Sequence, residues 1–235
     1  MGRSQFRRGP ERGFHHWEVR PIASRAHSFN ESMNTLSLTG IDVGSPRLPG
    51  KTSHSTHGME IAAGGEDIWG TRDEFHFAHA KVSGNFEVSV RIESLGMADV
   101  YTKAGLMLRA SLEAGAEHAM MLAFTDNQPR NHNNGGLEFQ SRIAPNGPCT
   151  GIYPPQPLPS QPDFPVNYPH VWLKLIRDGD TITGRNSREG ERWKTYCVHQ
   201  QRLPPAAYLG LAVTSHNVNL AVKGMFRHLN FSRKP

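Results

Sequence analysis

The chain has 235 residues, two cysteines and a formal net charge of +5. A length of this order suits a single domain with a sizeable core, and all-β sandwiches often reach it as one unit. No apolar run approaches the roughly 20 residues of a membrane-spanning helix, which argues against a membrane span. Cys149 and Cys197 match no metal-binding spacing, so they are either two thiols of a cytosolic protein or a disulfide pair.

The positive charge is concentrated at the N-terminal end of the chain. Residues 1–30 hold six arginines and two glutamates, a charge of +4, which leaves +1 for the rest. We expect residues 1–34 to form a basic, flexible leader that is solvated or that contacts nucleic acid or anionic lipid. The nearly neutral domain, residues 35–235, is not expected to bind nucleic acid. Arg7-Arg8 precedes no apolar segment, so the absence of an export signal favours a cytoplasmic location over secretion.

Short strands are predicted along most of the domain. They are expected at Leu36–Ile41, His57–Ala62, Glu74–His79, Phe86–Leu95, Ala104–Ala110, His118–Thr125, Leu137–Ile143, Val171–Arg177, Thr181–Ser187, Lys194–Val198, Leu209–Ser215 and Met225–Phe231. Apolar and polar residues alternate strictly along Phe86–Leu95, which is typical of a strand with one buried face. Asp178-Gly179 predicts a tight hairpin between two of these strands. Many short strands without a long helical period indicate a sandwich of two antiparallel sheets.

Two segments interrupt this pattern. Ser111–Glu117 is expected to form a short helical turn. Residues 144–169 contain nine prolines, and proline is excluded from central strands because it lacks the amide donor. We therefore expect a long loop there, partly in polyproline II conformation. Its aromatic residues Tyr153, Phe164 and Tyr168 either pin the loop to the sandwich or offer flat faces to a ligand.

Four motifs occur in a familiar order. They are GGEDIWGTRDEFHF (Gly64–Phe77), KAGLMLRASLEAGAEHAMM (Lys103–Met121), LEFQSR (Leu137–Arg142) and LGLAVTSHN (Leu209–Asn217). Together they resemble the DUF1349 family, which has a concanavalin A-like jelly-roll fold and includes a yeast protein named for regulation of enolase. The resemblance implies two curved antiparallel sheets and a link to secreted carbohydrate-active proteins, but no catalytic activity. Tyr101 stands where the family usually has tryptophan, and the proline-rich loop is longer than usual.

Alternation along three central strands places polar side chains on one face of a sheet. The candidate ligand-binding residues are Lys103, Arg109, His118, Glu138, Gln140, Arg142 and His216. Arginine, glutamine and glutamate suit sugar hydroxyls or a carboxylate, and the concave face of a jelly roll would gather them. Met107 and Phe139 would add apolar contacts. The alternative is a solvated face held by surface ion pairs.

Calcium is the one cofactor that the sequence suggests, through the carboxylates near Trp69. Asp67, Asp73 and Glu74 are candidate calcium ligands, although their spacing is not that of an EF-hand. We favour turn-stabilising roles for these carboxylates over calcium binding. No other cofactor is expected. Trp69 is expected to anchor the core or a sheet edge rather than to serve as a sugar platform.

The sequence contains no recognisable catalytic set. A retaining glycosidase needs two carboxylates about 5 Å apart, and no same-face pair at that spacing is evident. We therefore expect a non-catalytic recognition module that binds carbohydrate on its concave sheet. One alternative is a cytosolic regulatory or protein-interaction protein. Another is a glycoside hydrolase-like enzyme whose acid pair the motifs do not reveal.

Overall fold

The structure, a computed structural model, describes residues 1–2, 36–56, 58–154 and 165–234. The leader expected over residues 1–34 therefore lies outside the described residues, apart from Met1 and Gly2. Phe164 and the middle of the proline-rich segment also lie outside them. Within the described ranges, no helix is both long and apolar enough to cross a bilayer.

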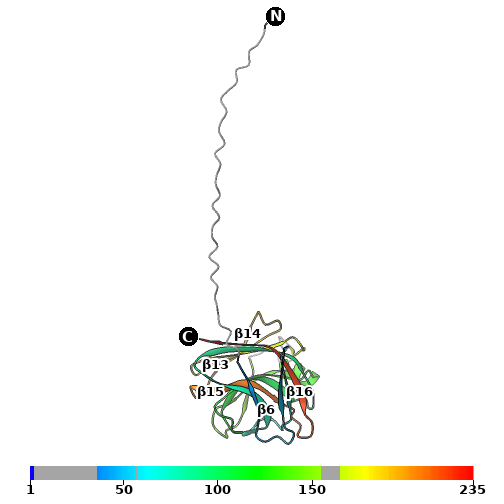
Figure 1. Ribbon diagram of the computed structural model, residues 1–235, viewed down its shortest axis with the longest axis vertical. Coiled ribbons are helices and arrows are strands. Elements are labelled where there is room, and N and C mark those ends of the chain that lie inside the picture. The colour runs from blue at the N-terminus through cyan, green and yellow to red at the C-terminus, as the bar shows by residue number, and fades with distance from the viewer. Residues whose placement is uncertain (3–35, 57, 155–164, 235) are drawn as a thin grey trace. The chain divides into compact units, whose positions relative to one another are not determined.

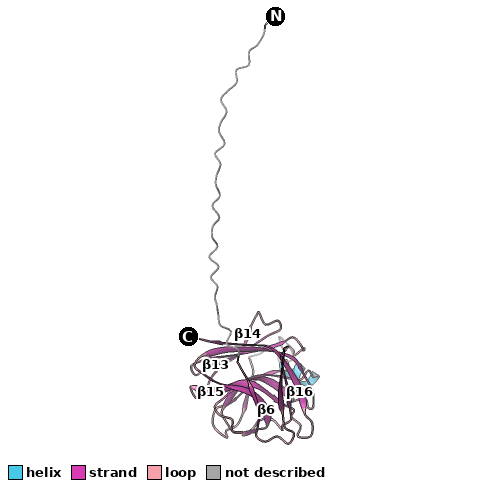
Figure 2. Cartoon of the chain, viewed as in Figure 1, coloured by secondary structure: helices cyan, strands magenta, loops and turns pink. Residues whose placement is uncertain are grey.

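The domain consists of two antiparallel sheets of seven strands each and one short hairpin (Figures 1 and 2). The first sheet has the order β1 (Thr39–Val43), β6 (Phe75–Ser83), β15 (Ala206–Thr214), β8 (Lys103–Arg109), β9 (His118–Phe124), β10 (Leu137–Arg142) and β11 (Thr150–Ile152). The second has the order β14 (Lys194–Gln200), β13 (Thr181–Ser187), β12 (Val171–Asp178), β7 (Phe86–Leu95), β16 (Val222–Arg233), β3 (Gly58–Ala63) and β2 (Lys51–Ser55). β4 (Ile68–Trp69) and β5 (Arg72–Asp73) form the hairpin. The predicted all-β sandwich is confirmed.

The main core lies between the two sheets. On β7, Phe86, Val88, Val90 and Ile92 are fully or almost fully buried, as the alternation of this strand predicts. Opposite them, β8, β9 and β15 contribute the alternate apolar residues of each strand. Burying such side chains stabilises the domain by about 1.5–3 kcal/mol each. The period of two in the sequence therefore identifies which face of each strand packs against the opposite sheet.

The outer face of the first sheet is not the open polar trough that the sequence suggested. A second apolar cluster covers much of it, made of Val43, Ile68, Phe75, Phe77, Met107, Met120, Leu122, Phe124 and Ala212. Every residue of β8, β9 and β10 is buried. The expected ligand contact by Phe139 is wrong because this residue lies in the main core, and Met107 is buried in the second cluster. An open space remains where this cluster ends, beside Phe124.

Several elements differ from the prediction. The short helix α1 (Gln128–Asn134) was not expected, although Asn127 caps it and a proline occupies its first turn, both of which are helix-start signals. Ser111–Glu117 contains a turn rather than a helix. The short strand β11 lies inside the segment predicted as loop, and the tight turn after β12 is formed by Gly179 and Asp180, one residue later than predicted. These differences are local and leave the sandwich unchanged.

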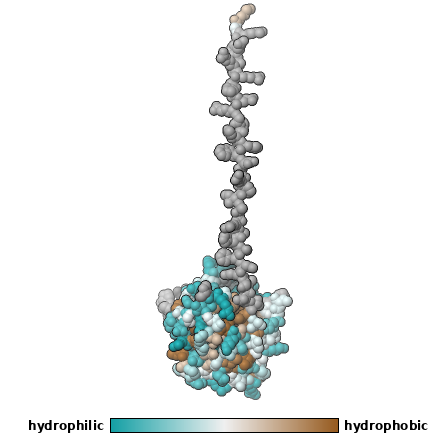
Figure 3. All heavy atoms as spheres, turned by 60° about the vertical axis from the view of Figure 1, so that its left-hand side comes forward, coloured by the Kyte–Doolittle hydropathy of each residue, from teal (hydrophilic) through white to brown (hydrophobic). Residues whose placement is uncertain are grey.

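The surface of the domain is mixed in character. On the face that Figure 3 shows, hydrophobic residues form separate small patches among hydrophilic ones. Both cysteines are buried as free thiols, so the disulfide alternative is wrong. They lie in different elements: Cys197 is in β14, and Cys149 precedes β11.

Candidate functional site

A cavity of about 330 Å³ opens where the second apolar cluster ends, on the outer face of the first sheet. We call it the inner cavity. It is lined by Asp67, Trp69, Tyr101, Lys103, Phe124, Arg130, Glu138, Gln140, Tyr153 and His216. These residues come from the β4–β5 hairpin, β8, β9, α1, β10 and the loops that follow β7, β11 and β15. Segments far apart in the sequence therefore meet at one site.

Three partly exposed aromatic rings line this cavity. Trp69, Tyr101 and Tyr153 have exposed fractions of 41%, 44% and 46%. Large aromatic side chains usually bury most of their surface, so three exposed rings at one cavity are an informative feature. Tyr101 contacts the His216 ring, with centroids 5.1 Å apart. Of the two positions expected for Trp69, the one in the core is wrong, since the preceding residue Ile68 takes the buried position. An anchoring role at a sheet edge stays a prediction.

Glu138 and Gln140 form the polar floor of the inner cavity. They lie two residues apart on β10, so both side chains point to the same face. The Glu138 carboxylate accepts hydrogen bonds from Gln140 Nε2 at 2.5 Å, from Arg130 Nη2 at 3.2 Å and from the Tyr153 hydroxyl. A carboxylate only accepts, so it fixes the orientation of the Gln140 amide. Gln140 Oε1 is then buried with no hydrogen-bond partner among the described residues.

The buried Lys103 and the partly exposed Asp67 form an ion pair beside this floor. The Lys103 ammonium lies 2.8 Å from Asp67 Oδ1, and His216 Nε2 lies 3.3 Å from Asp67 Oδ2. Lys103 also lies near the rings of Trp69 and Phe124, at 5.9 and 5.5 Å from their centroids. The guanidinium carbon of Arg130 lies 3.9 Å from the centroid of the Phe124 ring. The two cations are thus each paired with one carboxylate and rest on aromatic faces.

The charges at this site support one another. Burial opposes ionisation of Asp67, but the hydrogen bond from His216 and the charge of Lys103 outweigh it and lower the pKa of the Asp67 carboxyl. The hydrogen bond to Asp67 raises the pKa of His216, although burial opposes this. Burial, followed by the hydrogen bond to Glu138, raises the pKa of Tyr153 to about 12. Tyr153 is therefore a neutral hydrogen-bond donor at neutral pH.

A fully buried charged cluster lies under the β4–β5 hairpin, beside the cavity. Asp73 Oδ1 and Oδ2 each lie 2.7 Å from an Arg142 nitrogen, and Arg109 Nη1 lies 3.1 Å from Oδ2. His118 Nδ1 lies 3.7 Å from the same carboxylate, and burial lowers the pKa of His118 to about 3. Fork-shaped guanidinium groups suit such a bidentate arrangement. The cluster is therefore one carboxylate held by two cations, with a neutral imidazole.

This cluster positions the hairpin that carries Trp69. Arg142 Nη2 donates to the backbone carbonyls of Trp69 and Gly70, at 3.0 and 3.2 Å. Arg109 donates to the carbonyls of Ser111 and Glu113, at 2.8 and 2.5 Å. The two arginines thus tie the hairpin and the 111–117 loop to the first sheet. They act on the site through the backbone, since neither lines the inner cavity.

The candidate ligand-binding residues divide into two groups. Lys103, Glu138, Gln140 and His216 line the inner cavity. The other three, Arg109, His118 and Arg142, belong to the buried cluster and are fully inaccessible. Alternation correctly assigned all these strand residues to the outer face, but it did not show that the hairpin covers one part of that face and leaves another open.

Six residues of the inner cavity are not among the candidate ligand-binding residues: Trp69, described above, and Asp67, Tyr101, Phe124, Arg130 and Tyr153. Arg130 was missed because α1 was not predicted, although Asn127 and Pro129 signal its start. Tyr101 departs from the family pattern at the edge of the expected ligand site. For Tyr153 the sequence leaves open whether the ring pins the loop or faces a ligand. The sequence predicts Asp67 as a candidate calcium ligand and Phe124 as a strand residue. Of the other loop aromatics, Tyr168 pins the loop, since its hydroxyl donates to the Phe124 carbonyl at 2.7 Å.

The candidate calcium ligands each have a cationic partner. Asp67 pairs with Lys103, Asp73 with Arg109 and Arg142, and Glu74 with Arg72 at 3.4 Å. Among the described residues, no three histidine, cysteine or acidic side chains lie close enough to hold a metal ion together. Each of the three carboxylates is therefore held by a cation of the chain itself.

The sequence matches no protein-family profile and no curated protein, so membership of the DUF1349 family is not established. Solved structures do show similarity. A functionally unknown protein from Saccharomyces cerevisiae superimposes with a TM-score of 0.62 at 14% identity, over 85% of this chain and 97% of that one. The carbohydrate-binding module CBM66 from Bacillus subtilis gives 0.53 at 15% identity, over 85% and 97%. The exoplasmic/lumenal domain of VIP36, bound to Ca²⁺ and Man3GlcNAc, gives 0.50 at 9% identity, over 85% and 84%.

These similarities show the fold of the chain. It is a concanavalin A-like β-sandwich of two seven-stranded antiparallel sheets, as the sequence predicts. The same fold occurs in a carbohydrate-binding module and in a domain bound to Ca²⁺ and Man3GlcNAc. At such low identity the likeness says nothing about individual residues, and the function has to be argued from the cavity itself.

Proposed function

We propose that this protein is a non-catalytic recognition module that binds carbohydrate in the inner cavity. The observation that carries the proposal is the combination of three partly exposed aromatic rings with a buried polar floor. Sugar rings present apolar C–H faces and hydroxyl edges, so they match a site with flat apolar walls and a few fixed polar groups. Solved structures that share the fold include a carbohydrate-binding module and a glycan-bound domain.

The balance of charge favours a neutral sugar. Lys103 pairs with Asp67 and Arg130 pairs with Glu138, so each cation of the cavity has a carboxylate within 3.2 Å. An anionic ligand would have to compete with these carboxylates for the two cations. The buried Glu138 carboxylate would then lose its cationic partner, which is costly. A neutral sugar, by contrast, leaves both ion pairs intact and can exchange hydrogen bonds with the hydroxyl of the exposed Tyr153 and with the Glu138 carboxylate, which the buried Gln140 amide holds in place.

Two alternatives make different predictions. A regulatory or protein-interaction protein would bind a protein partner without measurable affinity for glycans. A hydrolase would turn over an oligosaccharide, and Glu138→Gln would abolish that turnover. Both are tested by the same panel of glycans used for the binding experiment.

The proposal is tested by screening the protein on a glycan array and measuring affinity for the hits by calorimetry. Trp69→Ala and Gln140→Ala should each weaken binding at least about tenfold, equal to about 1.4 kcal/mol. Matched controls are Trp193→Ala and Gln200→Ala, which change the same residue types in the β13–β14 region, away from the cavity. Absence of any glycan binding would refute the proposal, as would equal losses in the site and control variants.

A further inference from the structure

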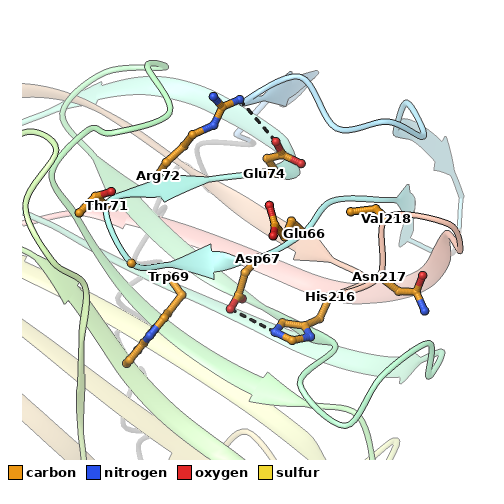
Figure 4. A pocket seen from close by; sticks show the side chains of 10 residues that line it. Glu66, Asp67, Trp69, Thr71, Arg72, Glu74, His216, Asn217 and Val218 are labelled. Atoms are coloured by element: carbon orange, nitrogen blue, oxygen red, sulfur yellow. Dashed lines mark hydrogen bonds and ion pairs between the residues drawn. The ribbon is translucent and has the colours of Figure 1, made fainter.

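A second, larger cavity adjoins the inner one along the β4–β5 hairpin (Figure 4). Its volume is about 630 Å³, and we call it the outer cavity. It shares three lining residues with the inner cavity, namely Asp67, Trp69 and His216. Because three residues line both spaces, the two cavities are neighbours along a common wall.

The common wall is built from fixed side chains. Figure 4 shows the Asp67 side chain directed at His216, an interaction of 3.3 Å. Lys103 holds the other oxygen of Asp67 from the inner side, at 2.8 Å. Trp69 projects from β4, which begins directly after Asp67, and Arg142 fixes the backbone at Trp69. The wall is therefore rigid, and the ring of Trp69 is accessible from both sides of it.

The outer cavity has few cations to attract an anionic ligand. Besides Asp67, it contains the carboxylates of Glu66 and Glu74. The guanidinium of Arg72 is held by Glu74, at 3.4 Å, and by the Gly44 carbonyl. The remaining lining residues that are not shared, including Thr71 and Asn217, are uncharged. Carboxylates in excess disfavour uronic acids and sulfated sugars by like-charge repulsion.

We propose that the two cavities form one extended site, in which an uncharged oligosaccharide chain crosses Trp69 and places sugar units in both cavities. This inference rests on the proposed function, since it needs the inner cavity to bind a sugar. It names the ligand class as a neutral glycan longer than a disaccharide. In this arrangement the inner cavity supplies the hydrogen-bonding floor, and the outer cavity adds affinity only when the chain is long enough to reach it.

The inference is tested with length series of neutral xylo-, cello-, chito- and fructo-oligosaccharides, from the disaccharide to the hexasaccharide. Calorimetry would compare the wild type, the double variant Glu66→Ala/Thr71→Ala in the outer cavity, and Gln140→Ala in the inner cavity. Glu191→Ala is the matched control, because Glu191 is an exposed glutamate that lines neither cavity. Circular dichroism of each variant would verify the fold.

The expected result depends on chain length. Wild-type affinity should rise between the disaccharide and the tetrasaccharide and then level off. The double variant should lose about tenfold in affinity for the hexasaccharide, or about 1.4 kcal/mol, and leave the disaccharide within twofold. Gln140→Ala should weaken binding at every length. Uniform affinity across lengths, or equal loss at all lengths in the double variant, would overturn the extended site while leaving the inner site standing. No binding of any series by the wild type would overturn both.

Discussion

Gln140 donates its amide hydrogen to the carboxylate of Glu138 across 2.5 Å, within one strand and on one face. This relationship prepares the site before any ligand arrives. The carboxylate engages the NH₂ group, so the carbonyl oxygen of Gln140 is left as a buried acceptor without a partner among the described residues. A buried acceptor of this kind is costly to leave unpaired. Because the whole Gln140 side chain has no exposed surface, we infer that its part at the site is to hold the Glu138 carboxylate in place.

Gln140→Glu tests how closely the two side chains are coupled. Replacing the amide by a carboxylate sets two acceptors against each other, so we expect a lower free energy of unfolding at pH 7 than in the wild type. Below about pH 4.3, where a glutamate side chain takes up a proton, the new carboxyl can donate again and the deficit should shrink. Urea denaturation at pH 7 and pH 4 measures this. Gln200→Glu, at an exposed position, is the control, and an equal deficit in both variants would contradict the coupling.

Asp73→Asn should strongly destabilise the domain. The substitution removes the charge that holds Arg109 and Arg142, both of which are fully buried. Breaking a buried ion pair by removing one partner costs about 3–5 kcal/mol. Guanidinium denaturation should show a loss of this size, while Glu60→Gln in the exposed pair with Lys223 should change the free energy by about 0–1 kcal/mol. A small effect of Asp73→Asn would show that the cluster does not hold the hairpin.

His216 should make the stability of the domain depend on pH. Its pKa in the folded protein lies above the usual 6.5 because of the hydrogen bond to Asp67. The stabilisation is therefore fully present below pH 6.5 and is lost as pH rises through the raised folded pKa. His216→Asn keeps a residue that tolerates the φ of 54° at this position. The difference in unfolding midpoint between wild type and variant should be larger at pH 5.5 than at pH 8.5, and a constant difference would refute this.

His118 should make the stability of the domain fall as pH falls, the opposite of the effect expected for His216. Burial lowers its pKa to about 3, so the unfolded chain binds a proton at this residue more readily than the folded chain does. The wild type should therefore lose stability as pH falls from about 6.5 towards 3. His118→Gln should reduce the slope of stability against pH over this interval, whatever its effect on absolute stability. The exposed His132 serves as control through His132→Gln. An unchanged slope in His118→Gln would show that His118 is not held neutral.

Both cysteines should be unreactive in the folded protein. Burial raises the pKa of Cys149 to about 12 and also raises that of Cys197. The thiolate is the reactive species, so iodoacetamide at pH 7.5 should label neither residue in the native state. In guanidinium both should be labelled without a reducing agent, because both are free thiols. Mass spectrometry of the intact protein reads out the two states, and rapid native labelling would contradict the burial.

The sequence predicted the parts of this protein that repeat with a period of two. Phe86–Leu95 and Thr181–Ser187 coincide with β7 and β13, because alternation directly reports which side chains point into the core. The outer face of the first sheet could not be predicted in this way. Alternation gives Lys103 and Arg109 the same face, yet only Lys103 reaches the cavity, because the β4–β5 hairpin covers Arg109. That covering depends on contacts between residues 36 and 69 positions apart, such as Arg109 and Arg142 with Asp73.

Within six residues, the β4–β5 hairpin contains side chains that attach it to the sheet and side chains that line the cavities. Asp73 and Ile68 face inward and fasten the hairpin to the sheet, while Trp69 and Thr71 face the two cavities. The fastening of Trp69 runs through its main-chain carbonyl, which any amino acid would offer to Arg142. Relatives with this architecture are therefore free to exchange the outward side chains, and with them the preferred ligand, without loosening the framework.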